Sequence, residues 1–492
     1  MDSTIKQRLI IYSIISGISY VYLILVPYLG IGITIFALMQ LALILFLTKD
    51  RSEVKNKKAL LLFIPLLVLT LRYFLSDSYT FYLSNFAVIF LLYSAMVLLM
   101  MDDLPIENQG LIFIMKILCT VFKPLFYFNV PVKWSIESNK DNQNRILIKK
   151  IFIGIAISIP CLVIIISLLS AADLVFESKI DVLFNSFGNI ISPLTIFRIV
   201  FGILVGLYLF GLFYMIFEKK NEGKGEVNPE TTEKIILKPQ GDLVIINVIL
   251  IAILAIYTLF ALIQFKYLFA GATLPSGFTY AEYARRGFFE LLFLSFINIG
   301  LILIIIYLTK DKIYNSTNKT GKFVKALMLY LCAITVLLLV SSFYRMVLYN
   351  NEYGFTELRL LVSIFLVFES IGLLLTFYFI IKPRFNIIAT YSVICLVFYL
   401  TINIINLDYF IAKNNINMYF DGKELDYYHL INLSADAAPQ MTRLLNSEDA
   451  NIKDAVDSYF ERIENRSLEA KDWQSFNLSR RRAIKIKNQL VK

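Results

Sequence analysis

The sequence predicts an all-α protein, a polytopic bundle of about eleven transmembrane helices followed by a small helical domain. Three observations predict this fold: the composition, the spacing of the apolar runs and the distribution of basic residues. Of the 492 residues, 58% are hydrophobic and only 17% are charged. Soluble domains carry about 45–50% apolar and about 25% charged residues. The chain therefore has more apolar surface than a water-exposed fold could bury, and it is predicted to lie in a bilayer.

About eleven stretches are apolar enough to cross a membrane, which takes about 20 residues in a helix. The first has no Ala-x-Ala-like cleavage site after it, so it is predicted to be an uncleaved signal anchor. The stretches occupy residues 9–26, 28–47, 59–75, 80–100, 148–170, 193–217, 243–265, 281–308, 323–348, 356–381 and 385–405.

The basic residues predict the orientation, because lysine and arginine in short loops resist translocation and stay in the cytoplasm. With the N-terminus inside, the cytoplasmic segments hold about 26 basic residues and the external loops about eight. The opposite orientation would reverse this bias. We therefore predict an N-in/C-out topology.

One connection, residues 101–147, bears on the number of crossings. Within it residues 110–128 are apolar, but Lys116, Lys123 and Pro124 interrupt the run. A cytoplasmic interfacial helix with its lysines at the headgroups fits this pattern better than a span. If the segment spans instead, every later element changes sides.

The composition changes after residue 407, and we place a domain boundary there. Residues 1–407 are predicted to form the transmembrane bundle, and residues 408–492 an extracytoplasmic helical tail. Apolar residues at helical spacing predict tail helices over 427–445, 450–463 and 473–490, with Asp449 as an N-cap. The ending RRRAIKIK fits either contact with anionic headgroups or a solvated helix face.

Several classes of function have no support in the sequence. The four cysteines, Cys119, Cys161, Cys332 and Cys395, lie singly in apolar stretches, and His429 is the only histidine. No nucleotide-binding, zinc-hydrolase or serine-hydrolase motif is present. The net charge of +10 is spread between apolar runs, which favours anionic lipid over nucleic acid as a partner. We predict no catalytic residue, cofactor or metal ion, and the bilayer as the main partner.

The stretch GFTYAEYARRGFFE, which ends at Glu290, is the most informative one. Thr279 and Glu282 have the spacing of a capping box, so a helix is predicted to begin there at the outer surface. Glu282, Arg286 and Glu290 follow at intervals of four and share one helix face, with Arg285 beside them. Glu290 would lie roughly 16 Å along the helix axis, near the bilayer centre.

A similar entry recurs once, which suggests a weak parallel repeat. Gly354, Phe355 and Thr356 repeat the Gly-Phe-Thr sequence, and Arg359 follows near the predicted outer surface. Glu369 would lie about 20 Å along the axis of this second helix.

Charged side chains at mid-membrane face the protein interior or water and usually find partners. Arg198, Arg345 and Arg359 are predicted on the outer side, where they could pair with the two deep carboxylates. The group is either a site that binds protons or a cation, or a set of ion pairs that only fixes packing. The complete candidate cluster comprises Glu282, Arg285, Arg286, Glu290, Arg345, Arg359 and Glu369.

Five stretches carry a resemblance to a known family. They read FAGATLPSGFTYAEYARRGFFELL, LLSAADLVF, YRMVLYNNEYGFTELRL, LINLSADAAP and WQSFNLSRRRA. They resemble a bacterial multi-pass membrane family catalogued as domain of unknown function 4173, close to 4153. The resemblance runs from near the first helix to near the C-terminus and implies an integral bacterial membrane protein with a similar helix count. It implies no substrate, cofactor or catalytic residue.

From these observations we predict a multi-pass protein of the bacterial plasma membrane. The leading interpretation is a non-enzymatic component for sensing or envelope assembly, whose tail meets an envelope protein partner. The alternative is a secondary transporter that uses Glu290 and Glu369 as proton or cation sites. A membrane enzyme ranks third, because no catalytic signature is present.

Overall fold

The structure, a computed structural model, describes residues 3–48, 56–101, 121–137, 193–222, 241–264, 288–314 and 319–490, with scattered positions between 118 and 180. Within these ranges every regular element is a helix, so the predicted all-α class is confirmed. Of the predicted interfacial segment 101–147, the structure describes mainly residues 121–137. These form a short 3-10 helix (Lys123–Tyr127) and the helix α6 (Val130–Glu137).

Nine helices in the described residues are long and apolar enough to cross a membrane, and all nine coincide with predicted spans. The chain is thus a multi-pass membrane protein. The nine segments are Ile31–Thr48, Lys58–Leu75, Tyr82–Met100, Leu194–Met215, Leu243–Ile263, Phe288–Thr309, Lys319–Tyr353, Glu357–Ile381 and Ile387–Ile404.

The two remaining predicted spans differ from these nine. Residues 9–26 overlap α1 (Ser3–Leu23), a helix that packs along α9 and α2 but is not among the nine. Residues 148–170 fall almost entirely outside the described residues. The count of eleven spans and the N-in/C-out orientation remain predictions.

The chain divides into two compact units, and each is described by itself. The first comprises Met1–Pro105, Leu111–Glu226 and Glu464–Arg481, and the second comprises Ile106–Gly110, Val227–Ile463 and Arg482–Lys492. This division crosses the boundary that the sequence suggested at residue 407. The physical reason is that residues 464–481 pack on the N-terminal helices, although they belong to the C-terminal tail.

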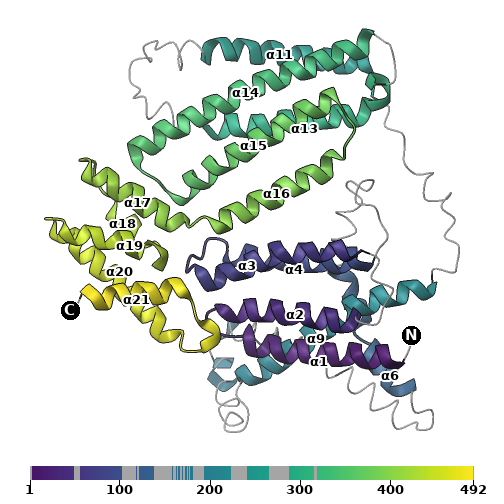
Figure 1. The fold of residues 1–492 in the computed structure, drawn as a ribbon, viewed down its shortest axis with the longest axis vertical. Helices are drawn as coiled ribbons and strands as arrows, with labels where there is room; N and C mark the ends of the chain where they lie inside the picture. Colours follow the sequence, from purple (N-terminus) through teal and green to yellow (C-terminus); the bar gives the residue numbers. More distant parts are fainter. Residues whose placement is uncertain are drawn as a thin grey trace. The chain divides into compact units, whose positions relative to one another are not determined.

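The long helices of the first unit lie alongside one another (Figure 1). A buried polar network joins α1, α2 and α4. The hydroxyl of Tyr12 donates to Oε1 of Gln40 at 3.0 Å and lies 2.7 Å from the hydroxyl of Tyr93, while Gln40 Nε2 donates to Ser16 Oγ. Such interhelical bonds stabilise bundles in lipid, where water cannot satisfy polar groups. The elements are α1, α2 (Ile31–Thr48), a 3-10 turn (Lys57–Leu62), α3 (Phe63–Leu75), α4 (Tyr82–Met101), α6 and α9 (Pro193–Glu222).

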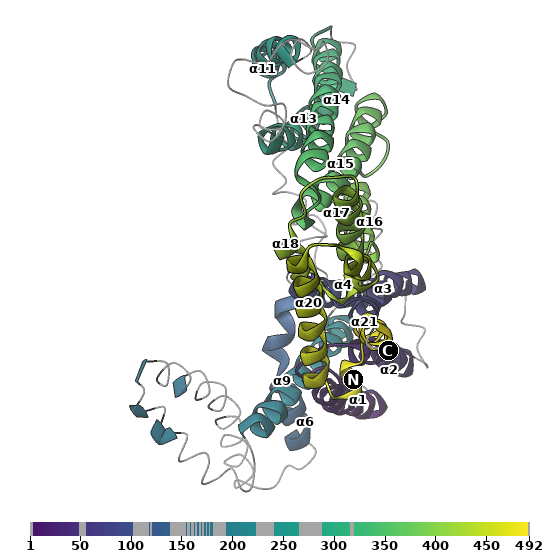
Figure 2. The ribbon, with the colours of Figure 1, turned by 90° about the vertical axis from the view of Figure 1, so that its left-hand side faces the viewer.

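The second unit has a comparable arrangement, in which α13, α14 and α15 lie side by side (Figure 2). Its interior also contains an interhelical polar chain: Tyr257 donates to Asn298, and Asn298 donates to Thr335 at 3.1 Å. Its membrane-spanning elements are α11 (Leu243–Gln264), α13 (Phe288–Tyr314), α14 (Lys319–Tyr353), α15 (Glu357–Ile381) and α16 (Ile387–Ile404).

The tail is helical, as the sequence predicts. Ser434 lies at its centre: the Ser434 N–H donates to the buried Asp408, and the hydroxyl of Tyr459 donates to the Ser434 carbonyl at 2.6 Å. Asp449 accepts from the N–H of Asn451 directly before α20, as expected of an N-cap. The tail elements are α17 (Leu407–Phe420), α18 (Tyr427–Ile431), α19 (Ala438–Met441), α20 (Ala450–Glu469) and α21 (Leu478–Leu490), with 3-10 turns at Ala435–Ala437, Thr442–Asn446 and Trp473–Ser475.

Candidate functional site

The first candidate site lies at the turn between α3 and α4. Helix α3 ends at Leu75, and Ser76 takes an extended conformation, φ −122° and ψ 142°. This change of direction puts Asp77 at the start of a short loop, and Asp77 is buried at 5% exposure. A buried carboxylate needs charge partners or several hydrogen bonds. The nearby tail segment supplies the partners.

Asn477 positions the tail segment against this turn. Its Nδ2 donates to the carbonyls of Tyr73, at 3.0 Å, and Ser76, at 2.8 Å. Its Oδ1 accepts from the N–H of Arg480 and thereby caps α21. One side chain therefore satisfies the end of α3 and the start of α21, and it places Arg480 one helical turn further on, next to Asp77.

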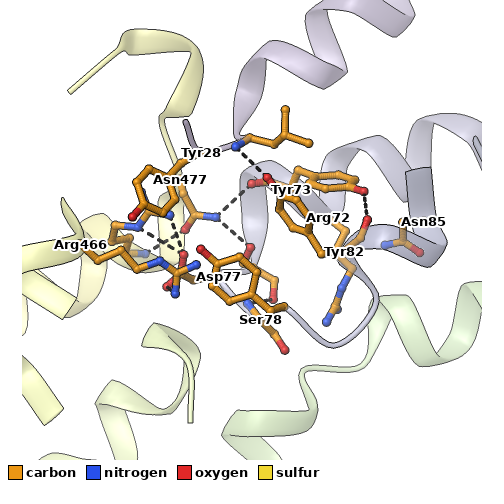
Figure 3. Close-up of a pocket in the computed structure, with 13 residues that line it drawn as sticks. Tyr28, Arg72, Tyr73, Asp77, Ser78, Tyr82, Asn85, Arg466 and Asn477 are labelled. Atoms are coloured by element: carbon orange, nitrogen blue, oxygen red, sulfur yellow. Dashed lines mark hydrogen bonds and ion pairs between the residues drawn. The ribbon is translucent and has the colours of Figure 1, made fainter. Parts of the chain in front are cut away.

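Two arginines from the tail contact Asp77, and Figure 3 labels one of them, Arg466, beside it. Arg480 donates through Nη2 and Nε to Oδ1 of Asp77, at 2.7 and 3.2 Å. Arg466, from α20, brings its Nη1 within 3.2 Å of Oδ2 of the same carboxylate. The side chains are exposed by only 2% for Asp77, 6% for Arg480 and 14% for Arg466. We call these three residues the tail anchor.

Aromatic rings line the tail anchor. The guanidinium of Arg466 lies 3.8 Å from the ring centre of Tyr79, and that of Arg480 lies 5.4 Å from that of Tyr28. Burial raises the pKa of Tyr79 above its ordinary value, although Arg466 opposes this shift. The hydrogen bond from Tyr28 to the carboxylate of Glu469 raises the pKa of Tyr28. Both phenols are therefore neutral near neutral pH, and Tyr28 is the donor to Glu469.

The space between these side chains is small. The cavity has a volume of about 20 Å³, which is enough for one water molecule. It borders two buried atoms, Asp77 Oδ2 and Arg466 Nε, that form no hydrogen bond within the described part of the chain. A single water could satisfy both atoms. The arrangement therefore suits a structural attachment better than the binding of a substrate.

Gly30, in the loop between α1 and α2, allows the tail segment to approach. A Cβ at this position would lie 2.5 Å from the backbone carbonyl oxygen of Phe476 and equally close to the carbonyl carbon of Ser475. The adjacent Ile31 N–H donates to that Phe476 carbonyl at 3.0 Å. Backbone meets backbone here, so only glycine fits.

The second candidate site is Glu369, in the second unit. This residue lies in the middle of α15 and is 6% exposed. Its Oε1 accepts from the hydroxyl of Ser295 on α13 at 2.6 Å, and its Oε2 is buried without a hydrogen-bond partner among the described residues. The sequence prediction that Glu369 is a deep intramembrane carboxyl group stays a prediction; the structure places Glu369 in a helix that is long and apolar enough to cross a membrane.

The structure describes four of the seven residues of the predicted polar cluster, Glu290, Arg345, Arg359 and Glu369. Glu290 lies in the first turn of α13 with its side chain exposed. Arg359 does not pair with Glu369; it donates to the carbonyl of Gly354 at 2.6 Å, and its guanidinium lies 4.1 Å from the ring centre of Tyr349. Arg345 is buried on α14. Glu282, Arg285 and Arg286 lie outside the described residues.

The repeated Gly-Phe-Thr entry has a structural role at its second occurrence. Gly354 has φ +76°, a conformation that favours glycine. Thr356 occupies the N-cap position of α15 but makes no side-chain capping bond. Instead Asn415 of α17 accepts from the Phe355 N–H at 2.6 Å and donates to the Phe355 carbonyl at 2.8 Å.

The sequence reasoning missed the tail anchor. Asp77 stands alone in a short loop, and no spacing rule links it to basic residues about 400 positions away. One indication was present: the WQSFNLSRRRA stretch includes Trp473, Asn477 and Arg480, and all three contact the N-terminal helices.

Comparison with known proteins identifies the family. A family model described as a domain of unknown function (DUF4153) matches residues 63–444. The match includes Asp77 and Glu369 and ends before the two arginines of the tail anchor. No curated protein and no solved structure matches the chain. The resemblance noted in the sequence was to family 4173, given as close to 4153, and it is confirmed at this level. The chain belongs to the DUF4153 family.

Proposed function

We propose that the protein is a non-enzymatic component for sensing or envelope assembly in the bacterial plasma membrane, with the tail as its partner-binding part. The observation that carries this proposal is the tail anchor. Breaking a buried ion pair by removing one partner is strongly destabilising. Arg466 and Arg480 therefore attach residues 464–481 to the loop between α3 and α4. A partner that pulls on or reorients the tail would act on the loop between α3 and α4.

The tail presents a surface that suits a partner. On α20, Asp454, Asp457 and Glu461 are exposed and follow at intervals of three and four, so they share one face. The opposite face, with Val456 and Tyr459, is fully buried. A partner with a basic surface would complement this acidic face, and the same helix ends at the tail anchor through Arg466.

The test uses a photo-crosslinking amino acid in place of Ser458, which is exposed on α20. In living cells we expect a discrete crosslinked species with an envelope protein. Opening the anchor with Asp77→Asn should reduce the yield severalfold while membrane insertion stays normal. A crosslinker in place of Lys322, exposed near the start of α14, is the control and should not form this species. A crosslinking profile at Ser458 that contains no discrete species, or that Asp77→Asn leaves unchanged, would contradict the proposal.

Glu369 supports a second candidate, a secondary transporter. A carboxyl group buried in a membrane, with one oxygen bonded to Ser295 and the other without a partner, is suited to binding a proton or a cation. Asn298 lies one helical turn beyond Ser295 on α13 and continues the polar chain to Thr335. This interpretation requires that the carboxyl group of Glu369 bind and release a proton or a cation reversibly.

The transporter candidate has a direct test. In proteoliposomes, Glu369→Gln should abolish substrate-dependent proton or cation flux, because the amide keeps the shape of the side chain but cannot ionise. Ser370→Ala, which alters the next position on α15, should leave the flux unchanged. If the Glu369→Gln variant transports like the parent, the transporter role of this carboxyl is wrong.

A further inference from the structure

Helix α21 starts at a defined level of the membrane. Asn477, the residue before α21, is bonded to the carbonyls of Tyr73 and Ser76. Tyr73 belongs to the last turn of the span that ends at Leu75. The end of a span lies at the boundary between hydrocarbon and headgroups. The first turn of α21 therefore lies at headgroup level, whichever way the bundle is oriented.

An aromatic pair marks the same level. The indole N–H of Trp473 donates to the hydroxyl of Tyr22 at 3.1 Å. Both rings are about half exposed, 50% for Trp473 and 57% for Tyr22. Exposed tryptophan and tyrosine rings concentrate at membrane interfaces, where their apolar and polar parts are both satisfied. Tyr22 lies in the last turn of α1, so the pair is placed where lipid headgroups are expected.

The exposed face of α21 is basic. Arg480 is used in the tail anchor, but Arg481, Arg482 and Lys485 are exposed. None of these three forms an ion pair within the part of the chain that the structure describes. The stem of Arg481 is held against the ring of Phe476, with 5.5 Å from its guanidinium to the ring centre. We call Arg481, Arg482 and Lys485 the basic face.

The neighbouring acidic residues do not neutralise the basic face. The carboxylate of Glu469 is hydrogen-bonded to Tyr28. Asp472 is exposed three residues after Glu469, next to the exposed Lys471. The three cations of the basic face thus lack a protein partner of opposite charge in the described residues.

We propose that the basic face of α21 binds the anionic headgroups of the membrane at whose boundary the helix begins. Phosphate groups of phosphatidylglycerol or a similar lipid supply the complementary charge, since basic residues next to a membrane attract anionic lipid. The contact adds a second attachment to the tail, independent of the tail anchor.

The chain offers a built-in reporter, because it contains only two tryptophans, Trp134 and Trp473. In a Trp134→Phe background, Trp473 is the single tryptophan, and it can be excited selectively at wavelengths that tyrosine does not absorb. It lies shortly before α21 in the sequence. The full-length protein is placed in nanodiscs of phosphatidylcholine with a minor fraction of phosphatidylglycerol. Bromine on the acyl chains quenches tryptophan by contact. One sample carries brominated phosphatidylglycerol, and the other carries an equal amount of brominated phosphatidylcholine.

If anionic lipid collects at the basic face, brominated phosphatidylglycerol should quench Trp473 about twofold or more strongly than the same amount of brominated phosphatidylcholine. The triple variant Arg481→Gln, Arg482→Gln, Lys485→Gln should lower this ratio to about one. Added salt should lower it in part, because screening acts over about 8–10 Å at physiological ionic strength.

The matched control neutralises three exposed lysines on other helices, Lys319, Lys322 and Lys453, and should keep the parental ratio. Hydrogen exchange of residues 473–480 shows whether the triple variant still docks its tail. Equal quenching by the two lipids in the parent would overturn the proposal without any variant. An unequal ratio that survives the triple substitution would overturn it as well, since another group would then attract the lipid.

Discussion

Replacing Asp77 with alanine is expected to weaken the attachment of residues 464–481 by about 3–5 kcal/mol, the usual effect of removing one partner from a buried ion pair. The substitution leaves two guanidinium groups, Arg466 and Arg480, close together without the carboxylate that separates them. Each 1.4 kcal/mol corresponds to a factor of ten in an equilibrium constant. Amide hydrogen exchange of residues 473–480 should therefore accelerate by about a hundredfold or more if the segment opens locally.

The geometry also predicts how the effects of alanine substitution at the three residues of the tail anchor rank in size. Arg480→Ala should have a smaller effect than Asp77→Ala, because Arg466 would still neutralise the carboxylate. Arg466→Ala should have the smallest effect, because its side chain is the most exposed of the three and its contact is the longest. Lys471→Ala, at an exposed position of the same segment, is the control and should change stability by less than about 0.5 kcal/mol. Equal effects at Asp77 and Lys471 would show that the ion pairs do not hold the segment.

Replacing Asn477 with alanine is expected to weaken the same attachment by about 2–4 kcal/mol, through a different cause. The carbonyls of Tyr73 and Ser76 would each lose their side-chain donor, and α21 would lose its N-cap. An unsatisfied buried polar group typically costs about 1–3 kcal/mol, and loss of an N-cap about 0.5–2 kcal/mol. Exchange of residues 473–480 and of the end of α3 should both accelerate, because the bonds join these two segments.

Two other asparagines provide controls for this prediction. Asn451, exposed in the first turn of α20, should tolerate alanine within about 0.5 kcal/mol. Asn415 bonds both backbone groups of Phe355 in the second unit. Its replacement should accelerate exchange around residues 353–356 and leave residues 473–480 unchanged. If Asn477→Ala left the exchange of residues 473–480 at the parental rate, the assigned role of this amide would be wrong.

Most of the helical organisation could be predicted from the sequence because it is a local property. A run of about 20 apolar residues must form a helix in lipid to satisfy its own backbone hydrogen bonds. The nine described spans therefore coincide with nine of the predicted runs. The place of Glu369 in the middle of α15 follows in the same way, since it lies near the middle of a long apolar run.

The partners of the charged residues were not predictable in the same way. Arg359 and Glu369 lie ten residues apart on one helix, yet Arg359 turns to the carbonyl of Gly354 while Glu369 bonds to Ser295 of α13. Which side chain meets which depends on the rotation and packing of neighbouring helices. Helical periodicity gives the face of a residue but not the identity of the helix that packs against it.

The sequence by itself determined that this is a multi-pass helical membrane protein, because composition and apolar runs are properties of the chain alone. Only the tertiary structure decided where the tail attaches. The bond between Asp77 and Arg480 joins positions separated by 403 residues. No local pattern encodes such a contact, since it exists only after the loop between α3 and α4, the glycine at position 30 and the capped start of α21 have been brought together by folding.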